Sequence, residues 1–311
     1  MGSGRLRGII KQYGTGVLAF VIVLLMMPLG HTLMVLLESG FGAEVFTSAL
    51  LVGTIGFAML WWGVARPLRD LYATLLGAIG GVLVWTGWVE FSFVWVARKL
   101  SVAPLMVDGE VATKPEYLVM VSSLGLLGSM LLMFLFMQTR CTFFVWLQKR
   151  MGTRDALVAA SDKALPRPLA VIAFLEMVII IWTFYLVLLL CYDEAIAGDR
   201  HPITWVVAFG SLFWSIHLIM KLVRIKAFDH AVRYAIPTVV IFWNFIEVMG
   251  RWDIFKEIWV HPKEHWLENS LLLGLLIFFV IYFMYTGRKD RQRRSRHLPT
   301  SVVQPSQPVG L

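Results

Sequence analysis

Long apolar segments alternate with short polar segments along almost the whole chain. Crossing the hydrocarbon core of a bilayer as a helix takes about 20 apolar residues. Eight runs approach or exceed that length, and each is followed by a short polar stretch. They lie at 15–37, 43–65, 71–97, 117–138, 168–191, 203–222, 231–250 and 268–286. The pattern predicts an all-α polytopic transmembrane bundle of about eight spans.

The polar segments indicate how the chain is divided. No domain boundary interrupts residues 1–287, which we interpret as one integral membrane domain. Residues 288–311 begin RKDRQRRSRH and predict a basic, disordered cytoplasmic tail. The loop at 139–167 includes FFVWLQKRMG, whose mixed apolar and basic residues predict an interfacial helix. The glycines of GAIGG at 77–81 predict close packing between helices.

Composition supports the membrane class, and the distribution of charge gives an orientation. The chain is 58% hydrophobic and 15% charged, with a net charge of +8. Of its Lys and Arg residues, 21 lie on one set of alternating loops and 7 on the other. The positive-inside rule therefore places both termini in the cytoplasm. These basic residues are expected to contact lipid head groups of the bilayer, so we do not expect a nucleic acid partner.

The opposite, outer loops carry most of the carboxylates, twelve against five on the inner side. This acidic outer face is a candidate surface for a membrane or periplasmic protein partner. No organelle-targeting segment is evident, and tryptophans gather at the outer level. We therefore expect a bacterial inner (cytoplasmic) membrane.

Three ionisable residues lie at a similar depth inside the spans. The helix rise of about 1.5 Å per residue gives their depth, counted from the inner end of each span. His31, Glu90 and Glu247 all lie roughly 24–28 Å from that end, in the outer third of the bilayer. Charged groups inside spans are costly and usually mark function. Histidine with two carboxylates suits a transition metal, a proton relay, or a polar pocket for a quinol head group or small substrate. The structural alternative is that both glutamates reach water or a nearby arginine at the span ends.

Two smaller groups of ionisable residues are further candidates. In the last outer loop, Asp253, His261 and His265 are candidate metal ligands, although HPKEH is not the HExxH protease motif. Nearer the inner side, Glu176 and His217 lie on consecutive spans and form a candidate hydrogen-bonded pair.

A haem with two histidine ligands is disfavoured, because His31 and His217 differ in depth by roughly 15 Å.

Three functions remain open from the sequence. One is a subunit of a larger membrane complex, with metal-dependent or redox chemistry at the outer His/carboxylate site. The second is a proton- or cation-coupled transporter or channel, and the third is a non-catalytic scaffold for a periplasmic partner. The chain has no GxSxG elbow, no P-loop and no GxGxxG after a strand, so no sequence motif indicates a particular reaction.

Overall fold

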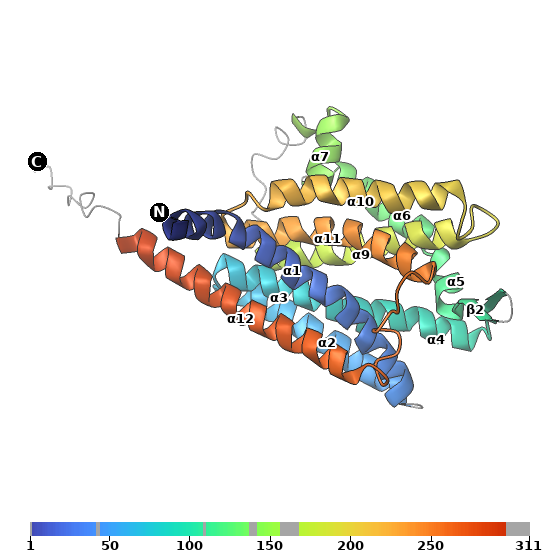
Figure 1. The fold of residues 1–311 in the computed structure, drawn as a ribbon. Coiled ribbons are helices and arrows are strands. Elements are labelled where there is room, and N and C mark those ends of the chain that lie inside the picture. Colours follow the sequence, from blue (N-terminus) through green and yellow to red (C-terminus); the bar gives the residue numbers. More distant parts are fainter. Residues whose placement is uncertain (1, 42–43, 108–109, 137–141, 156–167, 297–311) are drawn as a thin grey trace, which may run out of the picture.

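The chain is a bundle of long helices, as the apolar pattern predicts (Figure 1). A computed structural model describes residues 2–41, 44–107, 110–136, 142–155 and 168–296. In that part of the chain, seven helices are long and apolar enough to cross a membrane, or eight if one bent pair counts as a span. The predicted all-α polytopic class is therefore confirmed.

The elements follow the eight apolar runs closely, with some additions. In chain order they are α1 (Gly2–Gly40), α2 (Val45–Ala65), α3 (Asp70–Val84), the π-helical turn η2 (Trp85–Glu90), α4 (Phe91–Lys99), β1 (Leu105–Val107), β2 (Glu110–Thr113), α5 (Pro115–Val121), α6 (Leu124–Phe136), α7 (Thr142–Arg150), α9 (Leu169–Tyr192), α10 (Pro202–Leu222), α11 (Phe228–Arg251) and α12 (Trp266–Arg296). Helix α7 confirms the helix predicted within 139–167, and its interfacial position stays a prediction.

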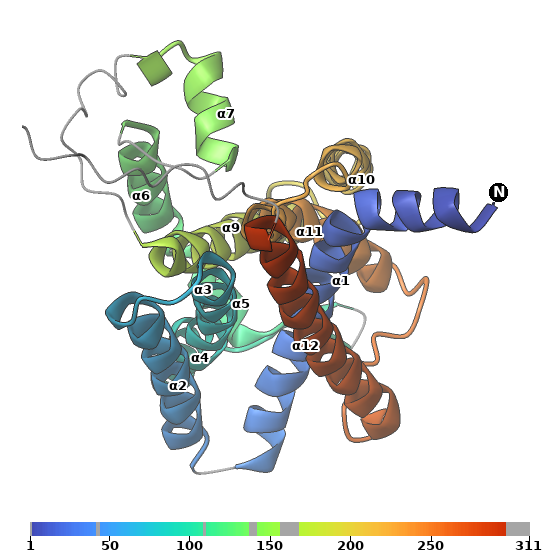
Figure 2. The ribbon, with the colours of Figure 1, turned by 90° about the vertical axis from the view of Figure 1, so that its left-hand side faces the viewer.

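The helices pack side by side in a consistent order. Helix α3 packs between α2 and α9, α9 packs on α11, and α10 packs on the far side of α11. Helix α1 crosses α11 and also contacts α12, as the end-on view shows (Figure 2). The start of α1 and the end of α12 lie at one end of the bundle, and the β1–β2 hairpin lies at the other (Figure 1). We refer to the hairpin end as the outer end, following the predicted orientation.

Glycines bring α2, α3 and α9 into close contact, as GAIGG predicts. A Cβ atom at Gly80 would lie 2.7 Å from the carbonyl oxygen of Gly56 on α2. A Cβ atom at Gly77 would overlap the backbone of Ala170 on α9. These positions therefore need glycine if the helix backbones are to approach this closely.

Two predicted spans are less regular than their apolar runs suggest. The third continues from α3 through the π-helical turn η2 into α4. The fourth divides into α5 and α6, which meet at an angle of 49°. At that bend Ser122 and Ser123 donate hydroxyl hydrogen bonds to the carbonyls of Val119 and Met120. The antiparallel hairpin between α4 and α5 pairs Met106 with Val111 and was not predicted.

The last helix extends further than the sequence suggested. Helix α12 continues to Arg296, so residues 288–296 are helical rather than disordered. Arginine, lysine and glutamine are good helix formers, and the helix ahead of them is already formed. The remaining tail, 297–311, lies outside the described residues, so its predicted disorder and the domain division stay predictions.

Candidate functional site

Helices α1 and α11 cross near the outer end and bring two of the predicted residues together. The Nε2 atom of His31 lies 3.1 Å from Oε1 of Glu247. The same carboxylate oxygen accepts a hydrogen bond of 2.5 Å from the indole Nε1 of Trp243, one turn earlier on α11. The side chains of His31 and Glu247 keep 22% and 23% of their surface exposed, so water or a ligand can reach the pair.

Aromatic rings hold the imidazole in place. Tyr185 of α9 and Trp243 of α11 both stack against His31, with ring centroids 6.4 Å and 6.2 Å away. The planes are tilted by 25° and 22°, which is close to parallel. Stacking and the hydrogen bond to Glu247 together fix the direction in which Nε2 points.

Glu90 joins this group through Tyr185. It is 4% exposed and ends the π-helical turn η2, a kind of turn that is frequent at functional sites. The Tyr185 hydroxyl donates to Oε1 of Glu90 at 3.3 Å and lies 3.2 Å from the hydroxyl of Tyr117. Tyr185 therefore contacts two ionisable residues of the site. Its hydroxyl donates a hydrogen bond to Glu90, and its ring stacks against His31.

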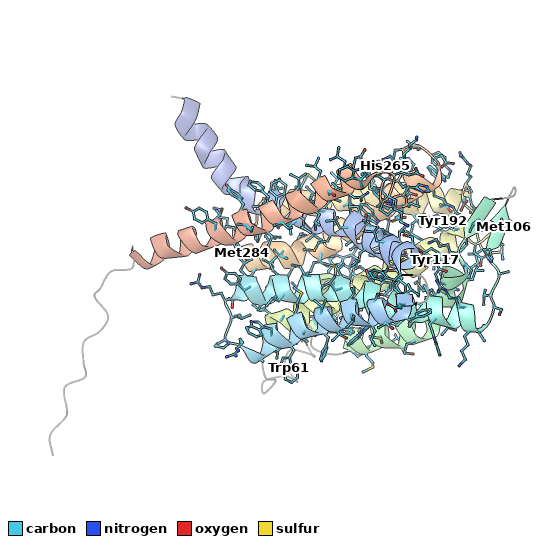
Figure 3. All side chains as sticks on the ribbon, turned by 90° about the horizontal axis from the view of Figure 1, so that it is seen from below. Trp61, Met106, Tyr117, Tyr192, His265 and Met284 are labelled. Atoms are coloured by element: carbon cyan, nitrogen blue, oxygen red, sulfur yellow. The ribbon has the colours of Figure 1, made fainter. Side chains whose placement is uncertain are left out.

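His31, Tyr185, Trp243 and Glu247 border a cavity of about 300 Å³ at the outer end of the bundle, and Glu90 lies behind Tyr185. Its walls combine aliphatic and aromatic side chains with His31, Glu247 and Asn244. Asn244 is 2% exposed, shares a helix face with Glu247, and its amide nitrogen has no hydrogen-bond partner in the described part of the chain. Figure 3 shows Tyr117 and Tyr192, which also line the cavity, in the half of the bundle that carries Met106 of the hairpin.

The rim of the cavity carries two cations, each with its own carboxylate. Lys114, after strand β2, pairs with Glu38 at 3.1 Å. Arg251, at the end of α11, pairs with Asp199 at 2.9 Å. These pairs fasten the outer loops to the helix ends and reduce the positive charge that the cavity experiences.

A third rim carboxylate, Glu257, belongs to the outer loop that joins α11 to α12. Burial raises its pKa to about 7, and the nearby carboxylates of Glu247 and Asp253 act in the same direction. A Cβ atom at Gly250 would overlap the Glu257 side chain, so glycine there allows this close approach. The sequence did not indicate that Glu257 is buried, because a glutamate in a polar loop carries no local signal of burial.

The candidate metal ligands do not gather three donors in the part of the chain that the structure describes. Among the described residues, no three His, Cys, Asp or Glu side chains lie close enough together to hold a metal ion. Asp253, His261 and His265 border an open depression of about 640 Å³, and His265 lies 3.5 Å from Glu268. The bound transition metal therefore stays a prediction.

The inner pair stays a prediction. Glu176 is buried on α9, at 4% exposure, whereas His217 is exposed on α10. Helix α10 packs mainly on α11 and only slightly on α9, so these consecutive spans are not nearest neighbours.

Comparisons with protein families, with curated proteins and with solved structures find no match. The function therefore has to be argued from the geometry of the site.

Proposed function

We propose that the protein is a proton-coupled carrier of small organic cations, with the outer cavity as its substrate site. The hydrogen-bonded pair of His31 and Glu247 on the cavity wall is the observation that carries the proposal. The volume, about 300 Å³, is at the small end of the range for small-molecule pockets.

The aromatic walls suit a positively charged ligand. Tyr117, Tyr185, Tyr192, Trp243 and Trp259 all line the cavity. Ring faces attract ammonium groups, and the attraction is stronger where water is excluded. The free amide of Asn244 offers a hydrogen-bonding contact for a polar substituent.

Charge pairing supplies the coupling to protons. Glu247 can be balanced by a protonated His31 or by an ammonium group that enters the cavity. When the ammonium binds, it repels the positive imidazolium, which releases its proton to water. One cation enters as one proton leaves, so the net charge of the site is unchanged. Chains of His, Asp and Glu inside spans carry protons in pumps and transporters.

The other functions from the sequence receive less support from the structure. A metal or redox role lacks three donors in one place among the described residues. A scaffold role would rest on the acidic outer face alone.

The proposal is tested by following protons during cation exchange. The protein is reconstituted into vesicles that contain a pH-sensitive dye, and benzyltrimethylammonium, a permanent cation, is added outside. We expect the interior to become alkaline faster than in protein-free vesicles, because cations enter in exchange for protons. Glu247→Gln should abolish this exchange, whereas Glu194→Gln, at an exposed outer-loop carboxylate, should not change it.

The proposal is wrong if wild-type vesicles behave like protein-free vesicles, or if Glu247→Gln exchanges at the wild-type rate. Elution as a single species and an unchanged thermal midpoint would establish that the Glu247→Gln variant is folded.

A further inference from the structure

A second cavity, of about 480 Å³, lies between α10 and α11 towards the inner end of the bundle. On its α10 side are His217 and Lys221, which are four residues apart and so share a helix face. Both are exposed, and Lys221 is in the last turn of α10. The cavity therefore presents two basic groups near the end of α10 that the predicted orientation places on the cytoplasmic side.

The rest of this cavity is mainly apolar, apart from Tyr234 and Thr238. Its α11 side runs from Tyr234 to Ile241, seven residues or about 10 Å along the helix. Pro237 lies between them and has no N–H to continue the helical hydrogen bonds. The rings of Trp146 and Trp214, from α7 and α10, are 6.2 Å apart at the border of the cavity.

Beyond this cavity the bundle is closed by apolar side chains. Pro237 and Ile241 also border a void of about 10 Å³, and Phe184 lines both that void and the outer cavity. The outer and inner cavities are thus separated by an apolar layer that includes Phe184, Pro237 and Ile241. The inner cavity is a distinct site with its own chemistry.

The geometry points to one anionic phospholipid of the surrounding bilayer as the occupant of the inner cavity. Its phosphate would contact His217 and Lys221, and an acyl chain would lie along the apolar side of α11. Tryptophans are enriched at this depth, and basic pockets between spans on the cytoplasmic side bind anionic head groups. The outward face of α10 is apolar and exposed, with Val206 at 71% and Phe213 at 68%, so bilayer lipid would lie directly beside the helix that carries His217 and Lys221.

The test measures lipid binding to the full chain. The purified protein is titrated with phosphatidylglycerol and, separately, with phosphatidylcholine, and bound lipids are counted by native mass spectrometry. We expect one phosphatidylglycerol to bind more tightly than phosphatidylcholine. Lys221→Ala should weaken that binding about fivefold, the effect of removing one basic group near the membrane surface. Arg224→Ala, which removes an exposed basic residue of the adjacent loop, should change it less than twofold.

A second variant separates the head group from the chain. Ile241→Trp fills the apolar part and keeps both basic groups, and it should also displace the lipid. Inorganic phosphate should not compete, because it cannot occupy the apolar part. Equal binding of the two lipids, equal effects of Lys221→Ala and Arg224→Ala, unchanged binding in Ile241→Trp, or displacement by inorganic phosphate would each overturn the proposal.

Discussion

One oxygen of Glu247 accepts hydrogen bonds from both His31 and Trp243, and the rings of Tyr185 and Trp243 stack against the same imidazole. The site is therefore organised by a few side chains that each make two contacts. Tyr185 is the most connected, since its hydroxyl also reaches Glu90 and Tyr117. Removing one such group should affect several others at once.

Tyr185→Phe should destabilise the protein. The change keeps the ring against His31 but leaves the buried Glu90 carboxylate without its hydroxyl donor, which costs about 1–3 kcal/mol. Thermal unfolding in detergent should show a lower midpoint. Tyr282→Phe, at an exposed tyrosine of α12, is the matched control and should leave the midpoint unchanged.

The same measurement can show whether the effect comes from Glu90. Adding Glu90→Gln to Tyr185→Phe should cost less than the two single changes combined, because the pair is then lost together. If the stability loss of the double variant equals the sum of the two single losses, Tyr185 and Glu90 do not interact.

Glu257 should make the stability depend on pH. Its pKa is about 7 in the folded protein and near 4.5 in the unfolded chain, so the folded state binds this proton more tightly. The stabilisation is complete below about pH 4.5 and is lost as the pH rises towards 7. The thermal unfolding midpoint of the wild type should fall as the pH is raised from 5 to 8, and that of Glu257→Gln should fall less. Parallel curves for the two proteins would show that Glu257 does not titrate in this range.

Some of this site follows from the sequence, and some does not. His31, Glu90 and Glu247 stand out because charged groups are rare in spans, and helix rise places them at one depth. Tyr185 and Trp243 do not stand out, because aromatic residues are common near both membrane surfaces. Their roles depend on which helices meet, and no local pattern gives that.

At the scale of elements, the glycine contacts of α3 decide how closely the helices pack. Gly77→Ala should push α9 away from α3, because the added methyl group would meet the Ala170 backbone rather than a flexible side chain. We expect a loss of about 1–3 kcal/mol, measured as a lower thermal midpoint. Gly210→Ala on α10 is the control, since no atom lies within 4 Å of its added Cβ. There the midpoint should stay or rise, because alanine favours helix.

The irregular elements could not be predicted from the apolar runs. The bend at Ser122 and Ser123 and the π-helical turn ending at Glu90 both lie inside apolar segments, where hydropathy alone cannot distinguish one helix from two. The predicted pairing of Glu176 with His217 rests on a related assumption, that consecutive spans are nearest neighbours, whereas α10 packs mainly on α11.

For the whole molecule, the predicted orientation can be tested by labelling. Cys141 and Cys191 are first replaced by serine, and a single cysteine is placed at Lys256 or at Lys226. A membrane-impermeant maleimide should label Lys256→Cys in intact cells and Lys226→Cys only after permeabilisation. The reverse result would invert the topology and place the His31–Glu247 cavity on the cytoplasmic side.

Most of the overall fold could be predicted because membrane insertion imposes a length of apolar sequence on each span. The order in which the helices pack could not, because lipid-facing and buried apolar side chains are nearly alike in composition. Exposed Leu271 of α12 and buried Ile236 of α11 are an example.

The apolar layer at Phe184, Pro237 and Ile241 has an electrical consequence. When water fills the outer cavity, that cavity conducts ions and takes the potential of the outside solution. The lipid-filled inner cavity and the apolar layer do not conduct ions, so the membrane voltage falls across them rather than across the full bilayer. A charge that crosses this shorter distance gains or loses about 2.3 kcal/mol for every 100 mV. Protons would then reach His31 and Glu247 from the outside solution without crossing the voltage.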